Sequence, residues 1–161
     1  MATRDDDAGS SLRRWGSGSG DPQLQAAVEL VIRYGLANPA YPWVKSGIPR
    51  SRWPEDWIDF RTLSSAAEQT PGQDGAVMRV AADFGRGFPV DPTVVAALDD
   101  DRRGLVLAAL TQRPVGEWPP PRATTPEIPT DVITQIITKE RRGLDRLLRD
   151  IQLTDRDTLD G

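Results

Sequence analysis

The sequence predicts an all-α fold: a small helical bundle domain with a disordered N-terminal tail, a proline-rich spacer and a C-terminal amphipathic helix. Three observations lead to this prediction. Apolar residues recur at spacings of three and four, no stretch sustains the alternation of a strand, and start and stop signals divide the chain into helix-sized segments. At 161 residues, 38% of them hydrophobic, the chain is long enough for one core.

Residues 1–20 are predicted to form a disordered tail. They carry three aspartates and three arginines and end in a Gly-Ser-Gly-Ser-Gly run. Beyond Met1, their only large apolar side chains are Leu12 and Trp15. So little apolar surface is not expected to offset the entropy lost on ordering the segment.

The helical domain is predicted over residues 21–112. Asp21-Pro22 is a strong start signal, because an aspartate caps free backbone N–H groups and proline needs no donor in the first turn. Leu24, Val28 and Val31 then recur on one face, which predicts a helix to about Leu36.

Residues 39–54 hold four prolines together with several large apolar side chains, so we expect an ordered loop rather than a helix. Two interpretations are open. The aromatic rings cover one end of the helical core, or they form a binding surface, because Tyr, Trp and Arg dominate interface hot spots. The candidate partner-binding residues here are Tyr41, Trp43, Arg50, Arg52 and Trp53.

Four further helices are predicted in the domain. The first begins at Pro54, with two carboxylates in its first turn, and ends near Gln69 at a Thr-Pro-Gly breaker. The second covers residues 73–84 and ends at Gly85-Arg86-Gly87. The third begins at Asp91-Pro92.

The run from Val90 to Gln112 is the densest apolar stretch, and it is interrupted by five consecutive charges at residues 99–103. Five charges span more than one turn, so an unbroken helix would place a charge on the apolar face. We therefore predict a break near Asp99, with an aspartate as the cap of the next helix. Adjacent aspartates fan about 100° apart on a helix, which disfavours a metal site.

Residues 113–129 contain six prolines and are predicted to be a semi-rigid spacer. An amphipathic helix is predicted over residues 130–153, followed by a tail at residues 154–161. Its stripe positions 133, 137, 140, 144, 147 and 151 hold Ile or Leu except at Glu140. Either this helix is the last of the same domain, or the spacer carries it outward to pair with another chain. Its candidate partner-binding residues are Ile133, Ile136, Ile137, Leu144, Leu147, Leu148 and Ile151.

The chain contains no histidine and no cysteine. Catalytic arrangements of Ser-His-Asp or Cys-His, and His-ligated or Cys-ligated zinc, cannot be made from it alone. We predict no catalytic residue, no cofactor and no metal site, and therefore a protein that is not an enzyme. A carboxylate-based enzyme remains an alternative without positive support.

The 20 basic and 24 acidic residues are mixed along the chain, so a nucleic-acid partner is not expected. Eighteen of the 20 basic residues are arginines that do not cluster, which favours a high-GC coding sequence of the bacterial kind over a recognition surface. No run approaches the roughly 20 apolar residues of a membrane span and no signal peptide is recognisable, so a cytoplasmic protein without membrane contact is expected.

Taken together, these features predict a non-catalytic protein–protein interaction module: an adaptor, assembly or regulatory subunit that forms a homo- or hetero-oligomer. Its contacts are expected from the C-terminal helix and from the aromatic loop. The alternative is a helical DNA-binding transcriptional regulator, with a helix-turn-helix at 73–84 and 91–98 and the C-terminal helix dimerising. The acidic balance and the apolar residues 94–97 argue against it.

Overall fold

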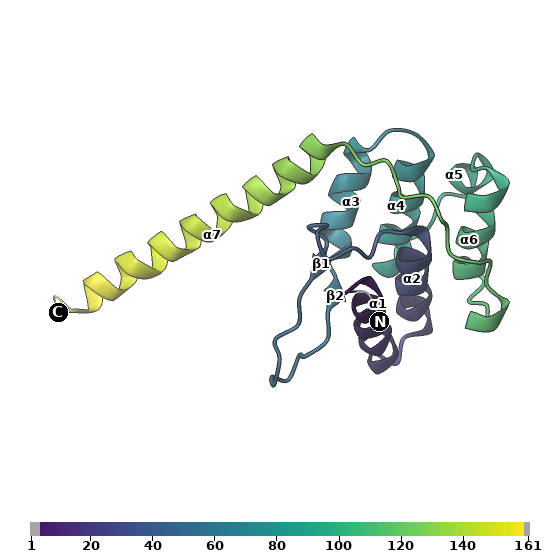
Figure 1. Cartoon of the computed structure of the whole chain (residues 1–161). Coiled ribbons are helices and arrows are strands. Elements are labelled where there is room, and N and C mark those ends of the chain that lie inside the picture. Colours follow the sequence, from purple (N-terminus) through teal and green to yellow (C-terminus); the bar gives the residue numbers. More distant parts are fainter. Residues whose placement is uncertain (1–3, 160–161) are drawn as a thin grey trace.

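The computed structural model of the chain describes residues 4–159, with side chains described for residues 9–153. Within this range the fold is mainly helical, which confirms the predicted class (Figure 1). The helices are α1 (Arg4–Gly18), α2 (Pro22–Tyr34), α3 (Phe60–Gln69), α4 (Gly72–Gly85), α5 (Pro92–Ala96), α6 (Asp100–Leu110) and α7 (Thr130–Leu159), with a 3-10 turn, η1 (Val115–Glu117).

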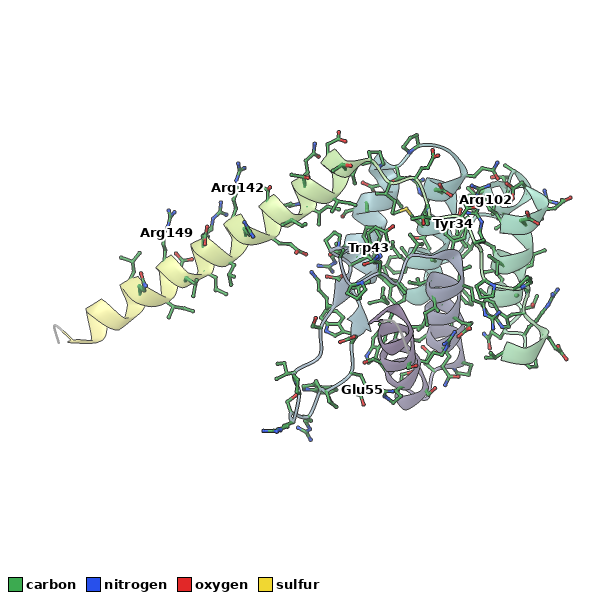
Figure 2. The ribbon with its side chains drawn as sticks, viewed as in Figure 1. Tyr34, Trp43, Glu55, Arg102, Arg142 and Arg149 are labelled. Carbon is green, nitrogen blue, oxygen red and sulfur yellow. The ribbon has the colours of Figure 1, made fainter. Side chains whose placement is uncertain are left out.

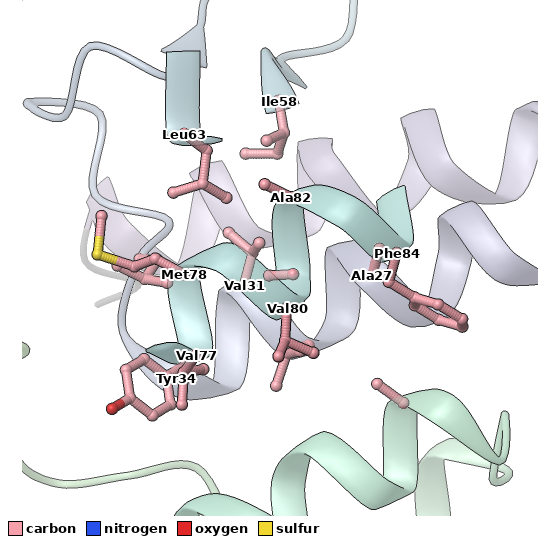
Figure 3. Close-up of a cluster of buried hydrophobic side chains, with 14 of the residues drawn as sticks. Ala27, Val31, Tyr34, Ile58, Leu63, Val77, Met78, Val80, Ala82 and Phe84 are labelled. Carbon is pink, nitrogen blue, oxygen red and sulfur yellow. The ribbon is translucent and has the colours of Figure 1, made fainter. Parts of the chain in front are cut away.

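Helix α4 lies at the centre of the bundle and packs against α2, α3 and α6. Side chains from these helices, among them Val31 of α2 and Val80 of α4, meet in a continuous hydrophobic core (Figure 3). Helix α4 begins close to the end of α3, and Gly75 makes this possible. A Cβ atom at residue 75 would lie 1.9 Å from the carbonyl oxygen of Thr70.

The aspartate caps predicted from the sequence are confirmed. The Asp21 carboxylate accepts a 2.9 Å hydrogen bond from the N–H of Gln23, and Asp91 accepts one of 2.9 Å from Thr93. The apolar run at residues 90–112 is divided as predicted: α5 ends at Ala96 and Asp99 caps α6.

The predicted helix start at Pro54 is wrong, and so is the expectation of no strand. Strand β1 (Val44–Lys45) pairs antiparallel with β2 (Trp57–Ile58), with Val44 opposite Ile58. Both of these side chains are buried in the core. The backbone at both positions is extended and not helical. Helix α3 begins only after Asp59, whose carboxylate accepts from the N–H groups of Arg61 and Thr62.

The predicted N-terminal disorder is also wrong for residues 4–18, which form α1; residues 1–3 lie outside the described range. Leu12 is 0% exposed, in the core that α2 and the strands help to form. Two polar contacts add to this burial: Arg13 pairs with Glu29 of α2, and the Ser11 hydroxyl accepts a 2.8 Å hydrogen bond from the N–H of Asp56. A few well-placed side chains thus order a segment of low average hydrophobicity.

The proline-rich segment between α6 and α7, which was predicted to be a semi-rigid spacer, crosses the bundle (Figure 1). Trp118 is 8% exposed, and the N–H of Arg122 donates a 2.9 Å hydrogen bond to the carbonyl oxygen of Arg33. Helix α7 then continues to Leu159, so residues 154–159 are helical where a tail was predicted; residues 160–161 lie outside the described range.

Candidate interaction surface

A buried polar cluster holds the proline-rich segment against α2, α4 and α6. Asp74 of α4 is at its centre and accepts a hydrogen bond from the Tyr34 hydroxyl. Arg102 of α6 donates to the same carboxylate at 3.1 Å, and the N–H of Glu127 donates to its other oxygen at 2.9 Å. The Arg122 guanidinium lies 4.8 Å from the centre of the Tyr34 ring.

The charges in this cluster are complementary. Burial acts to raise the pKa of the Asp74 carboxyl, but the hydrogen bonds it accepts outweigh burial, so this pKa lies below its ordinary value. Burial, reinforced by the bond to Asp74, raises the pKa of the Tyr34 phenol, which therefore remains a donor at neutral pH. The N–H of Glu127, three residues before α7 begins at Thr130, is thus bound to this cluster.

A second ionic contact holds the other end of the same segment. Glu29 of α2 is buried and accepts from Arg13 at 3.0 Å and from Arg33 at 2.7 Å. Burial acts to raise the pKa of Glu29, but the two arginines outweigh burial and keep it below its ordinary value. Arg33 also donates to the carbonyl oxygen of Pro119 at 2.8 Å, and its guanidinium lies 5.7 Å from the ring centre of Trp118.

The first turns of α7 dock on the domain through contacts with α3. Val132 and Ile136 are buried there, with exposed fractions of 4% and 8%. One turn further, Lys45 of β1 donates a 2.6 Å hydrogen bond to Glu140. A hollow of about 410 Å³ lies beside this junction, lined by α3 residues, including Arg61, and by Gln135, Ile136, Lys139 and Glu140 of α7.

Beyond Glu140, α7 extends away from the bundle (Figure 1). We call residues 141–153 the α7 arm. Four apolar residues of the arm and one just before it lie on one side of the helix at spacings of three, four and seven. We call this set the front stripe: Ile137, Leu144, Leu147, Leu148 and Ile151. Its five side chains are 38%, 57%, 56%, 50% and 51% exposed, respectively.

From residue 139 onward, the opposite side of α7 is polar and mainly basic. Lys139, Arg142, Arg146 and Arg149 follow one another at spacings of three and four, so they share that side. Figure 2 shows Arg142 and Arg149 projecting from the same side of α7. Leu153, 61% exposed, lies nine residues from Leu144, or two and a half turns, and so is on this side too.

The second exposed apolar feature is the hairpin formed by β1, β2 and the loop between them. The loop is ordered by its own hydrogen bonds: the N–H of Ile48 donates to the carbonyl oxygen of Trp53 at 2.9 Å, and that of Gly47 donates to the Asp56 carboxylate at 3.0 Å. Ile48 and Trp53 are 65% and 70% exposed. Among the described side chains, nine of the twelve exposed large apolar ones lie on this hairpin or on α7.

The structure divides the predicted partner-binding residues of α7 into two groups. Ile136 is buried against the domain and Ile133 is half-buried, so these two help to dock the helix. The other five form the front stripe and are exposed. The structure thus combines the two interpretations that the sequence left open: the first turns belong to the domain, and the arm extends outward.

In the aromatic loop, Trp43 is instead a core residue. It is 0% exposed, its indole N–H donates to the carbonyl oxygen of Leu36 at 2.8 Å, and its ring stacks on the half-buried Tyr41. Arg50, Arg52 and Trp53 are exposed, as a binding surface requires.

Two features of the site were missed from the sequence. Ile48 joins Trp53 on the exposed hairpin. The second is the Lys45–Glu140 contact just before the start of the arm. The sequence feature that could have indicated it is Glu140, the one charged residue in a stripe of Ile and Leu.

No family model matches the sequence, and no significant match was found among curated proteins or solved structures. In the part of the chain that the structure describes, none of the helices combines the length and apolar character needed to cross a bilayer.

Proposed function

We propose that this chain is a non-catalytic protein–protein interaction module, an adaptor, assembly or regulatory subunit that binds its partner through the α7 arm. The observation that carries the proposal is the front stripe, whose side chains are about half exposed on a helix that extends from the domain. Contiguous apolar surface of this kind is typical of sites that another molecule covers.

The mode of contact follows from the geometry of the helix. An amphipathic helix binds by laying its apolar side into a groove or against another helix, with anchors one turn apart. Leu144, Leu148 and Ile151 are spaced in this way. The exposed hairpin, with Ile48 and Trp53 at its loop, is a second contact point for the same partner.

The way in which the chain uses its buried carboxylates supports a non-catalytic role. Glu29 and Asp74 are both paired with arginines. Asp74 contacts the proline-rich segment directly through the N–H of Glu127, and Glu29 positions Arg33, which donates to the carbonyl oxygen of Pro119. Their pKa values are lowered, whereas a general acid at neutral pH needs a raised one.

The DNA-binding alternative gains no support from the fold. Helix α5, the recognition helix in that scheme, is five residues long, and Val95, its fourth residue, is buried. Its sequence, PTVVA, offers no basic or amide side chain to a base edge.

The proposal is tested by affinity recovery with the full chain, followed by mass spectrometry. Wild type is compared with Leu144→Asp, on the front stripe, and with Leu153→Asp, which places the same charge on the opposite side of the same helix. We expect the front-stripe variant to lose the wild-type partner and the control to retain it. Identical recovery by all three proteins would contradict the proposal.

A further inference from the structure

We propose that α7 also binds the phosphate backbone of a nucleic acid, through the side of the helix opposite the front stripe. The contact is made by four residues that we call the basic row: Lys139, Arg142, Arg146 and Arg149. This surface goes beyond the proposed protein contact and does not depend on it. The two surfaces lie on opposite sides of one helix, so the chain can hold a protein partner and a nucleic acid at the same time.

The basic row exists because the helix sorts charges that are mixed along the sequence. At about 100° per residue, the four side chains fall within a strip about 80° wide. In this part of α7, Glu140 lies on the front side and is bound to Lys45, while Asp145 and Asp150 lie at the two edges of the strip. The expectation of no nucleic-acid partner considered order along the sequence, which does not reveal this arrangement in space.

None of the four cations in the basic row has a carboxylate partner among the described side chains. In the domain, by contrast, Arg13, Arg33 and Arg102 are each paired with a buried carboxylate. All four side chains of the row are exposed, and Arg142 and Arg149 point away from the hairpin (Figure 2). The row is therefore accessible to an anion from outside the chain.

The row continues onto the domain at the hollow between α3 and α7. Arg61 of α3 and Lys139 both line this hollow, and its one carboxylate, that of Glu140, is bound to Lys45. The other polar groups that line it are hydroxyls and amides: Thr62, Ser65, Gln69 and Gln135. Cations together with hydroxyl and amide donors are the groups that bind phosphate oxygens. One phosphate contact therefore lies in the hollow, and the others follow along the row.

The composition of the row favours a nucleic acid over an acidic protein. Along the roughly 15 Å from residue 139 to residue 149, no apolar side chain lies among the four cations. A protein interface depends on buried anchors such as Trp and Tyr, which this strip lacks. Binding to a phosphate backbone is driven by the release of counterions and needs no apolar contact. Arginine, at three of the four positions, also offers two parallel N–H donors to a phosphate.

The net charge of −4 does not oppose this contact, because most of the row lies far from the bundle. Charges more than about 8 Å apart are largely screened at physiological ionic strength. Arg149 lies about 29 Å along the helix axis from Thr130, where α7 begins. The contact differs from a helix-turn-helix, because it uses α7 and reaches phosphates alone, so it does not read the base sequence.

The test measures binding of the full chain to a fluorescein-labelled DNA duplex of mixed sequence by fluorescence anisotropy. Between about 50 and 200 mM salt, five phosphate contacts give a slope of about −4.5 in the logarithm of affinity against the logarithm of salt concentration. The variant Arg142→Gln/Arg146→Gln/Arg149→Gln retains two contacts, so we expect a slope of about −2 and at least about tenfold weaker binding. Circular dichroism checks that α7 is retained.

The matched control is Arg14→Gln/Arg79→Gln/Arg113→Gln. It removes three exposed arginines of the domain, so its net charge equals that of the row variant. We expect it to bind the duplex as wild type does. Leu144→Ala, on the front stripe, should also leave duplex affinity unchanged, which separates this test from that of the proposed function.

Three outcomes would overturn the inference. The first is a wild type that does not bind the duplex at the lowest salt concentration, and the second is equal binding by the row variant and its matched control. The third comes from competition with polyglutamate, which represents an acidic protein. If polyglutamate displaces the labelled duplex as readily as unlabelled duplex does at equal charge concentration, the row does not select phosphate.

Discussion

The ammonium group of Lys45 donates a 2.6 Å hydrogen bond to Oε1 of Glu140, joining the base of the hairpin to α7 at the point where the helix leaves the domain. Glu140 is the one charged residue among the Ile and Leu positions of the stripe. Its contact explains that exception. Before Glu140 the helix is held by apolar burial against α3, and beyond it the apolar side chains face solvent.

We predict that Glu140→Gln changes the direction of the arm more than the stability of the fold. Both partners are partly exposed, and pairs of this kind contribute at most about 1 kcal/mol to the free energy of unfolding. The variant should therefore unfold within that margin of wild type. The distance distribution between spin labels at Ser51→Cys and Arg142→Cys, measured with the labelled chain diluted in unlabelled protein, should broaden.

The matched control is Lys139→Gln, which also removes one charge from this turn of α7 but leaves the contact with Lys45 in place. If Glu140→Gln and Lys139→Gln give the same distance distribution, the ion pair does not orient the arm.

The lowered pKa of Asp74 leads to a prediction of how the free energy of unfolding depends on pH. Its folded-state pKa is lowered, so its contribution to stability is complete above 3.8, the ordinary value for an aspartate, and is lost as pH falls below it. Asp74→Asn should cost about 3–5 kcal/mol at neutral pH, because Arg102 and Arg122 lose their buried counter-charge. The variant should also lose less stability than wild type on acidification.

Urea unfolding at neutral pH and below 3.8 measures both effects. Asp145→Asn, at an exposed position on the arm, is the control and should change unfolding by less than about 0.5 kcal/mol. An Asp74→Asn protein with the acid sensitivity of wild type would show that other carboxylates dominate.

Substitution of Leu12 tests whether α1 is packed on the domain in solution. Because this side chain is fully buried, Leu12→Ala should lower the free energy of unfolding by about 2–5 kcal/mol. Leu153→Ala makes the same change at an exposed position and should stay within about 0.5 kcal/mol of wild type. Chemical denaturation of the two variants compares them directly, and equal midpoints would indicate that α1 is not held in solution.

The features predicted correctly from the sequence depend on residues that are close together in the chain. An aspartate cap bonds to a backbone N–H two or three residues away, so Asp21, Asp91 and Asp99 could be identified from local order alone. The front stripe was visible for the same reason, because residues three, four and seven apart share one side of a helix.

The features that were missed depend on contacts between distant residues. Leu12 is buried by parts of the chain that follow it, and the two-residue strands exist because Val44 and Ile58 meet in the core. Trp43 was predicted to be a partner-binding residue. The residues that flank it in the sequence do not indicate whether its ring faces solvent or the core. Lys45 and Glu140 are 95 residues apart, and no local pattern pairs them.

Asp99 provides a test of the local rule. Its carboxylate caps α6 through the N–H of Arg102 at 2.9 Å, and it also pairs with the Arg102 guanidinium. Asp99→Ala removes both contacts and should cost about 1 kcal/mol. Asp99→Asn keeps a capping oxygen without the charge and should cost less than half as much. Thermal or urea unfolding of the two variants separates the contributions: equal losses would mean that the charge, and not the cap, stabilises the start of α6.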